Sequence, residues 1–165
     1  MHLQLSEEQQ FIKATARRFS TDELFPIAAQ LDIGQGRALL LANLQKLADL
    51  GFMGLNISAE YGGTEAGSVA FSVALTELGR ACASTAVTVS VTNMVGEVIQ
   101  ACGTEQQKQN YLPKLCSGEY PAGGFCLTES VAGSDPAGMK TRAVKEGDSW
   151  VLNGTKLYIT SAKYA

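Results

Sequence analysis

The chain has 165 residues, and 45% of them are hydrophobic, which suits one or two small domains with a real core. A net charge of −3 argues against a nucleic-acid-binding protein, which needs a basic face to neutralise phosphates. There is no apolar run of roughly eighteen residues that could cross a membrane, and the single histidine, His2, excludes a His-based catalytic triad or a His-rich metal site.

Four cysteines are spread along the chain without a Cys-x-x-Cys pair, so neither a zinc site nor a disulfide framework is indicated. They are Cys82, Cys102, Cys116 and Cys126, and we expect free, reduced thiols. Residues 1–4 lack the basic and apolar regions of a signal peptide. The expected location is therefore the cytoplasm, or the mitochondrial matrix if the source is eukaryotic.

The first 120 residues have the hydrophobic spacing of helices. Ser6-Glu7-Glu8-Gln9 has the form of a capping box. Apolar residues follow it at helical spacing, namely Phe11, Ile12, Ala16 and Phe19. A short helix is expected over 23–30, with Pro26 in its first turn, where a missing N–H costs little. Its apolar side is formed by Leu24, Ile27, Ala28 and Leu31.

The next helix is predicted from an apolar stripe formed by Leu40, Leu44, Leu47 and Ala48. Gly51 fits the position just after its end. Tyr61-Gly62-Gly63 marks a turn in an irregular stretch, 52–67. Ser68 is then expected to cap a further helix. The inner positions of that helix are Val69, Val73 and Leu78.

Residues 84–102 carry conflicting signals. Apolar and polar residues alternate over 86–91, and the β-branched side chains there are typical of a strand. The second half has helical spacing and ends at Gly103. We predict one buried helix. A second capping box, Thr104-Glu105-Gln106-Gln107, then begins the last helix of this part.

From about residue 121 the pattern changes to short strands. We expect strands over 124–127, 139–144, 150–153 and 157–160. Glu146-Gly147-Asp148 suits a hairpin turn, and Asn153-Gly154 is a strong two-residue hairpin signal. Helices followed by an antiparallel sheet indicate an α+β protein, with a helical domain at 1–120 and the start of a β domain at 121–165. Because so few strands leave an open edge, we expect this β domain to be incomplete.

Three stretches together resemble the acyl-CoA dehydrogenase family. The first runs from Gly51-Phe52-Met53-Gly54-Leu55 to Glu60-Tyr61-Gly62-Gly63. The second combines Gly103-Thr104-Glu105-Gln106-Gln107-Lys108 with Tyr111-Leu112-Pro113 and Gly118-Glu119. The third is residues 125–135, followed by 150–156 and 158–161. Its Leu-Thr-Glu…Ala-Gly-Ser-Asp run resembles the family's flavin signature, although Ser130 stands where the family usually has proline.

The third stretch has the residue types that a flavin needs. A flavin ring requires an apolar wall and a few polar donors at its edge. Phe125 and Leu127 can form such a wall, and Thr128 offers a donor beside them. Tyr158 adds an aromatic face, and Thr160 adds another hydroxyl.

The loop after this wall suits a phosphate. Gly133 permits a close backbone approach, and Ser134 offers a hydroxyl and an N–H to an anion. The resemblance implies that Thr128 bonds the pyrimidine edge of the flavin and that Thr160 lies near N5. It also implies that Tyr158 stands beside the ring. Ser134 is expected near the FAD pyrophosphate and the entering acyl-CoA substrate.

The resemblance further implies an FAD-dependent oxidation of acyl-CoA thioesters, as in fatty-acid or branched-chain acyl oxidation, by a homo-oligomer. Electrons then pass to an electron-transfer flavoprotein. In the family the catalytic base is usually a Glu of the C-terminal domain, which is expected beyond residue 165, so no catalytic residue is assigned. Glu129 and Asp135 are expected to be solvated or capping residues.

Other interpretations remain open. Acyl-CoA oxidases, nitroalkane oxidases and flavin monooxygenase relatives share much of the same signature. A cofactor-free, catalytically inactive helical module that self-associates is an alternative from another class, because exposed sheet edges seek contacts. Taken alone, Thr128 and Ser134 suit simple turns, and alternation of Tyr158 with Thr160 suits a strand with one buried face.

Overall fold

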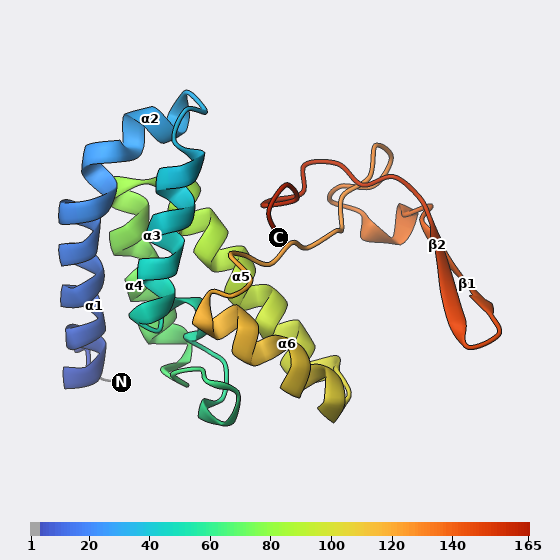
Figure 1. Ribbon diagram of the computed structural model, residues 1–165, viewed down its shortest axis with the longest axis horizontal. Helices are drawn as coiled ribbons and strands as arrows, with labels where there is room; N and C mark the ends of the chain where they lie inside the picture. The colour runs from blue at the N-terminus through green and yellow to red at the C-terminus, as the bar shows by residue number, and fades with distance from the viewer. Residues whose placement is uncertain (1–3) are drawn as a thin grey trace.

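A computed structural model describes residues 4–165, so His2 lies outside the described residues. Within this range, six α-helices are followed by one antiparallel hairpin (Figure 1). The helices are α1 (Glu7–Phe19), α2 (Ala28–Asp32), α3 (Arg37–Asp49), α4 (Gly67–Ala81), α5 (Ala83–Cys102) and α6 (Glu105–Ser117). The strands are β1 (Arg142–Glu146) and β2 (Ser149–Asn153). The predicted α+β class, with helices first and antiparallel strands after them, is confirmed.

Both predicted capping boxes are present. Before α1, the Gln9 N–H donates to Ser6 Oγ at 3.2 Å, and the Ser6 N–H donates to Gln9 Oε1 at 3.0 Å. Thr104 and Gln107 form the same reciprocal pair before α6. After α3, Gly51 has a left-handed φ of +81°, as expected for a glycine that ends a helix. These helix ends can be predicted from sequence because the residues that form each cap lie within one helical turn of each other.

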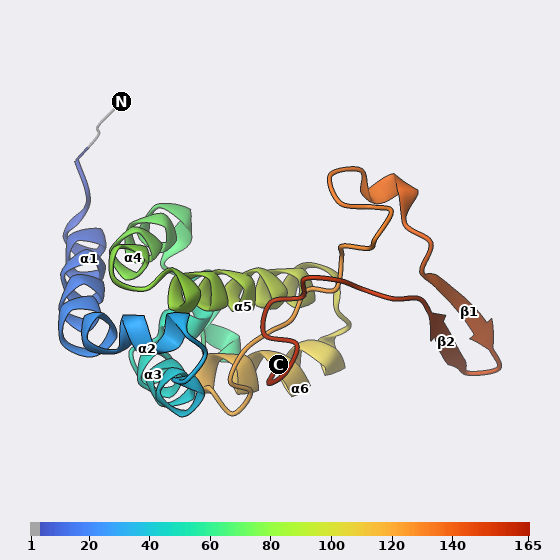
Figure 2. The ribbon, with the colours of Figure 1, turned by 90° about the horizontal axis from the view of Figure 1, so that it is seen from above.

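The main core joins α1, α3, α4 and α5, and Figure 2 shows α5 lying between α4 and α6. Its most deeply buried side chains include Leu24, Leu44, Leu47, Leu78 and Val89. The apolar stripe predicted for α3 is therefore correct. Phe11 lies outside the buried stripe of α1 and is 72% exposed, because it is turned by about 100° from Ile12 around the helix.

The single helix expected over 23–30 is wrong. The chain instead forms a π turn (Ser20–Leu24), a 3₁₀ turn (Phe25–Ile27) and the short α2. Pro26 has no N–H to donate to the Asp22 carbonyl, so the helical bonding that continues from α1 is interrupted at this position.

Ser68 does not cap α4. The helix begins at Gly67, and the preceding Ala66 makes no side-chain cap. Gly67 has a left-handed φ of +82°, and the helix begins two residues earlier than a Ser68 cap would have placed it. Val69, predicted to lie inside, is 53% exposed, whereas Leu78 is fully buried as predicted.

The predicted helix over 84–102 is confirmed as α5, despite its β-branched residues. The Thr88 hydroxyl donates to the Ser84 carbonyl at 2.9 Å, and the Thr92 hydroxyl donates to the Thr88 carbonyl at 2.8 Å. Val89 is fully buried on the same helix. Tertiary burial thus outweighs the modest preference of these side chains for strands.

The hairpin predicted over 139–144 and 150–153 is present with a later start. Its register runs from Arg142 opposite Asn153 to Glu146 opposite Ser149. Gly147 supplies the left-handed turn residue, with φ of +62°. Every strand residue is exposed, and the hairpin projects away from the helices (Figures 1 and 2).

The strands predicted over 124–127 and 157–160 are absent. The Leu127 N–H bonds to the Phe125 carbonyl at 3.1 Å, which closes a tight turn in place of a ladder. Tyr158 has a left-handed φ of +57°, which ends any extended run after Leu157. The Asn153-Gly154 signal therefore does not produce a second hairpin.

Candidate functional site

The chain leaves the helices at a tight contact with α5. The Gly123 N–H donates to the buried Thr92 hydroxyl oxygen at 3.0 Å. A Cβ at position 123 would lie 2.8 Å from Val95 Cβ, closer than side chains pack. Glycine is therefore needed here, and the predicted site begins at a fixed point on the surface of α5.

Two segments of the predicted site lie side by side. The Leu157 N–H donates to the Thr128 carbonyl at 2.9 Å, and a Cβ built on Gly124 would lie 3.5 Å from the Thr160 carbonyl oxygen. Residues 124–128 therefore run beside 157–160, although they are about thirty positions apart in the sequence. Phe125, Leu127, Thr128, Tyr158 and Thr160 are all brought to this junction.

The side chains at the junction are open to ligands to different degrees. Phe125 is 38% exposed and Tyr158 is 91% exposed. Leu127, Thr128 and Thr160 are half-buried. An apolar and aromatic surface with two nearby hydroxyl-bearing residues is therefore partly accessible.

Gly133 and Ser134 lie in an exposed loop after a tight turn. The turn is closed by the Glu129 N–H to Ala132 carbonyl bond at 2.9 Å and its return bond at 3.2 Å. A Cβ on Gly133 would meet no atom within 4 Å. The packing of this chain thus does not itself require glycine at 133. No contact recorded among the described residues joins Ser134 to the ring-side residues.

Glu129 is buried, which corrects the expectation that it is solvated or capping. Its carboxylate accepts from the Lys140 N–H at 2.7 Å, the Thr141 N–H at 3.0 Å and Lys156 Nζ at 2.9 Å. The neighbouring Thr141 hydroxyl, the Lys140 N–H and the Lys156 ammonium lower the pKa of Glu129 to about 2. Asp135 is a capping residue as predicted, since its Oδ1 accepts from the Ala137 N–H at 3.2 Å.

Sequence reasoning assigned no role to Lys156. Its ammonium also donates to the Leu127 carbonyl at 2.9 Å and lies 3.3 Å from Met139 Sδ. The available signal was a charged side chain directly before Leu157-Tyr158-Ile159, because a lysine in an apolar stretch needs a partner when it is buried.

The helical motifs of the resemblance hold a loop in place. The buried Asn93 amide accepts from the Leu55 N–H at 2.7 Å and donates to the Phe52 carbonyl at 2.9 Å. A Cβ on Gly63 would collide with the Ile57 carbonyl oxygen. The Tyr61 hydroxyl donates to Glu105 at 2.9 Å, and this bond, with burial, raises the pKa of Tyr61 to about 12.

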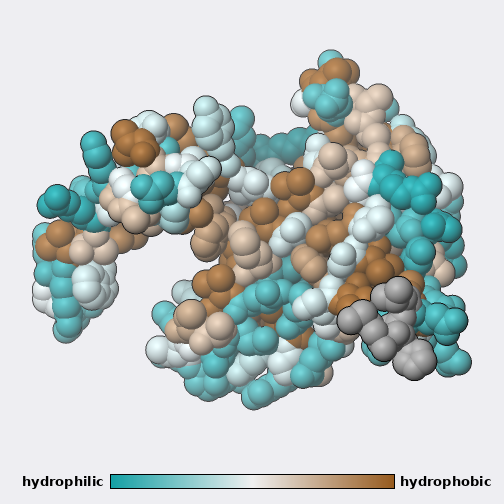
Figure 3. Space-filling view, turned by 180° about the vertical axis from the view of Figure 1, so that it is seen from behind, coloured by the Kyte–Doolittle hydropathy of each residue, from teal (hydrophilic) through white to brown (hydrophobic). Residues whose placement is uncertain are grey.

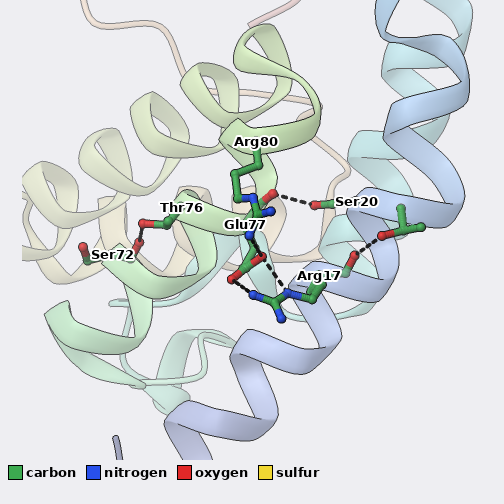
Figure 4. Close-up of polar contacts among 7 residues, drawn as sticks. Arg17, Ser20, Ser72, Thr76, Glu77 and Arg80 are labelled. Atoms are coloured by element: carbon green, nitrogen blue, oxygen red, sulfur yellow. Dashed lines mark hydrogen bonds and ion pairs between the residues drawn. The ribbon is translucent and has the colours of Figure 1, made fainter. Parts of the chain in front are cut away.

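A second buried carboxylate, Glu77, joins α4 to α1 (Figure 4). Arg17 donates to both of its oxygens, at 3.0 and 2.9 Å, and Arg80 lies 3.7 Å away. The Arg17 hydrogen bonds hold the pKa of Glu77 below its usual value, although burial acts in the opposite direction. The Ser20 hydroxyl donates to the Glu77 carbonyl at 3.0 Å. The charges of Glu77 and Arg17 thus hold α4 and α1 together.

Other kinds of site find little support in the part of the chain that the structure describes. Within residues 4–165, no three His, Cys, Asp or Glu side chains gather where a metal ion could be held. The same range contains no helix that is long and apolar enough to span a membrane. Cys82, Cys102, Cys116 and Cys126 are free. Burial raises the pKa of Cys116 to about 11, so this thiol is a poor nucleophile at neutral pH.

Two family profiles match consecutive parts of the chain. The profile of the acyl-CoA dehydrogenase N-terminal domain matches residues 6–119, and the profile of the acyl-CoA dehydrogenase middle domain matches residues 124–165. The helical body and the junction beyond it thus correspond to two successive domains of one flavoprotein class. The chain belongs to the acyl-CoA dehydrogenase family.

Individual relatives agree with this assignment. The mitochondrial short-chain specific acyl-CoA dehydrogenase of Bos taurus is 40% identical, over 97% of this chain and 38% of its own length. Glutaryl-CoA dehydrogenase of Mycobacterium smegmatis, solved with FADH2, has a TM-score of 0.88 at 32% identity, over 98% of this chain and 41% of that one. A structure described as the electron transferring flavoprotein of Acidaminococcus fermentans has a TM-score of 0.88 at 33% identity, over 100% of this chain and 43% of that one. The chain therefore spans about two fifths of the length of these relatives.

Proposed function

We propose that this chain supplies the helical domain, up to about residue 120, and part of the flavin site of an FAD-dependent acyl-CoA dehydrogenase. The complete enzyme oxidises the Cα–Cβ bond of an acyl-CoA thioester and passes the electrons to an electron-transfer flavoprotein. The observation that carries the proposal is the alignment of residues 124–128 with 157–160, fixed by the 2.9 Å bond between Leu157 and Thr128.

The residues at this junction fit a flavin ring. Bound FAD supplies the hydride acceptor of the reaction. Phe125 and Leu127 provide an apolar surface, and the exposed Tyr158 provides an aromatic one. With FAD bound, the Thr128 hydroxyl would bond the pyrimidine edge of the ring, and Thr160 would lie near N5.

The loop after Glu129 suits the phosphates. The open space beside Gly133 supports a close approach of the FAD pyrophosphate to the backbone. The exposed Ser134 adds a hydroxyl for the pyrophosphate and for the entering acyl-CoA. Both assignments are supported by the position of these residues directly after the tight turn at 129–132.

We assign the proton-abstracting base to none of the residues described. Glu129 is the carboxylate nearest the junction, but Lys156 and two backbone N–H groups already bind it. With a pKa of about 2 it is a very weak base at neutral pH. We therefore expect Glu129 to take no part in proton abstraction.

We propose that the complete enzyme works in the cytoplasm or the mitochondrial matrix, and the mitochondrial relative of Bos taurus supports the second location. The similarity to the Acidaminococcus fermentans flavoprotein supports electron transfer to a second flavoprotein over oxidation by O₂. Slow reoxidation of the reduced flavin by O₂ in the complete enzyme separates a dehydrogenase from an oxidase of the same fold.

The test is a titration of the purified chain with FAD, followed by flavin fluorescence and visible absorbance. Thr128→Ala and Thr160→Ala should each weaken binding roughly three- to tenfold, the value of one hydrogen bond of about 1 kcal/mol. Thr76→Ala is the matched control, because this α4 hydroxyl bonds the Ser72 carbonyl far from the junction (Figure 4). A folded chain that leaves the FAD spectrum unchanged at every concentration contradicts the proposal.

A further inference from the structure

We infer that Glu129 and Lys156 are positioning residues for the flavin, because their buried ion pair sets the spacing between the two segments that form the ring site. This inference rests on the proposed function and adds two residues to it. Neither side chain is assigned a contact with the flavin. Both act through ring-side residues near them in the sequence: Thr128 directly precedes Glu129, and Tyr158 lies two positions after Lys156.

Lys156 connects the two segments directly. Its ammonium, on a side chain that is 19% exposed, lies 2.9 Å from Glu129 Oε1 and 2.9 Å from the Leu127 carbonyl oxygen. One cation on the 157–160 side therefore binds the residues on both sides of Thr128. A buried lysine is stable when such partners are present and costly when they are lost.

Glu129 extends the connection to a third segment. Its two oxygens accept from the N–H groups of Lys140 and Thr141, which lead into β1. The carboxylate is 5% exposed, so its charge must be balanced inside the protein. Lys156 supplies the balancing positive charge. The segments at 127–129, 140–141 and 156–157 are therefore all held at the Glu129 carboxylate.

Three consecutive residues, 127–129, are thus held in place, while the side chain of Thr128 stays available to a ligand. The Leu127 carbonyl is held by Lys156, the Thr128 carbonyl by the Leu157 N–H, and the Glu129 carboxylate by the groups above. Among the residues that the structure describes, the Thr128 hydroxyl makes no hydrogen bond, unlike its neighbours. A binding group must be held within roughly 0.5 Å of its working position, and this clamp fixes the backbone that carries it.

The test compares Lys156→Met with Lys145→Met, an exposed lysine on β1. In the chain without flavin, hydrogen exchange at the Leu157 amide should become at least about tenfold faster in Lys156→Met and stay unchanged in the control. With FAD, the affinity should fall by about tenfold, by analogy with outer-shell partners of other ligands, and the visible circular dichroism of the flavin should change. Lys156→Arg, which keeps the charge and the donors, should restore much of both signals.

The outcomes separate this inference from the proposed function. Unchanged Leu157 exchange in Lys156→Met overturns the clamp, whether or not flavin binds. Faster exchange with unchanged flavin affinity and circular dichroism overturns the positioning role. If the wild-type chain binds no FAD, the proposed function fails, and the flavin-positioning role fails with it, while faster exchange still establishes the structural clamp.

Discussion

Glu77 is 4% exposed and faces Arg17 and Lys13 across the contact between α1 and α4, and Arg80 lies near it on α4 itself. Since the Arg17 hydrogen bonds lower its pKa in the folded state, the unfolded chain binds a proton more readily at this site. The pair therefore stabilises the fold at pH values above 4.5, the ordinary pKa of this carboxyl group. This contribution is lost as the pH falls through the lower pKa that Glu77 has in the folded state.

Glu77→Gln should lower the stability at pH 7 and should flatten its dependence on acid. The glutamine cannot take up a proton, so the variant loses less stability than the wild type as the pH falls below about 4.5. Urea midpoints at several pH values measure this. Glu60→Gln, at an exposed glutamate, serves as the control. Parallel acid profiles for Glu77→Gln and the wild type contradict the prediction.

Asn93 is completely buried and satisfies two backbone groups of the loop after α3. Asn93→Ala leaves the Leu55 N–H and the Phe52 carbonyl without partners, and each unsatisfied buried group costs about 1–3 kcal/mol. We predict a loss of about 2–4 kcal/mol in the free energy of unfolding, measured by chemical denaturation. Asn110→Ala, at an exposed position of α6, should change it by less than about 0.5 kcal/mol. Equal effects of the two substitutions disagree with this account.

At the scale of the turns, two glycines of the family motifs should behave in opposite ways. Gly63→Ala forces a Cβ against the Ile57 carbonyl, which is backbone and cannot move aside alone, so a loss of about 1–3 kcal/mol is expected. Gly133→Ala meets no atom of the chain, so its stability should stay within about 0.5 kcal/mol of wild type while FAD binding weakens. Thermal unfolding and the FAD titration check both, and normal FAD binding by Gly133→Ala refutes the close-approach role.

Among the elements, both capping boxes and most helices followed from the sequence, the helix over 23–30 and the Ser68 cap did not, and the strands followed in part. A capping box such as Ser6 with Gln9 is decided within one turn, so the residues contain the answer. The segments at 124–127 and 157–160 have strand-like residues, but the turn at Phe125 and the left-handed Tyr158 prevent a ladder. Strand propensity depends on the neighbours that a segment meets, and the sequence does not state them.

The candidate site could be proposed from its residue types, whereas the contacts that connect its segments could not. Thr128, Tyr158 and Thr160 could be proposed from a motif, whereas the ion pair of Glu129 with Lys156 spans 27 positions and follows no helical or strand period. Such a pair becomes visible when the fold brings three segments together. The same reason explains why Glu129 was expected in solvent and is instead buried.

For the molecule as a whole, the unusual feature is the projecting hairpin. Its exposed apolar side chains include Val144, Trp150 and Leu152, which is 71% exposed, and Figure 3 shows hydrophobic atoms on this lobe. A two-stranded hairpin is marginally stable by itself in water, and an apolar edge of this kind favours pairing with another strand. We therefore predict that the isolated chain associates with a second copy of itself through β1 and β2.

The single tryptophan makes this testable. Trp150 is 62% exposed, so its fluorescence should resemble that of tryptophan in water at low protein concentration and shift to shorter wavelength as the chain associates. Leu152→Glu should keep the long-wavelength emission and a monomeric sedimentation profile, because a charge would have to be buried in the contact. Val69→Glu, at a similarly exposed apolar position on α4, should associate like the wild type. If the wild type sediments as a monomer at every concentration, the predicted association is wrong and the hairpin is stable without a partner. If Val69→Glu is the variant that dissociates, the contact between copies lies on the helices instead.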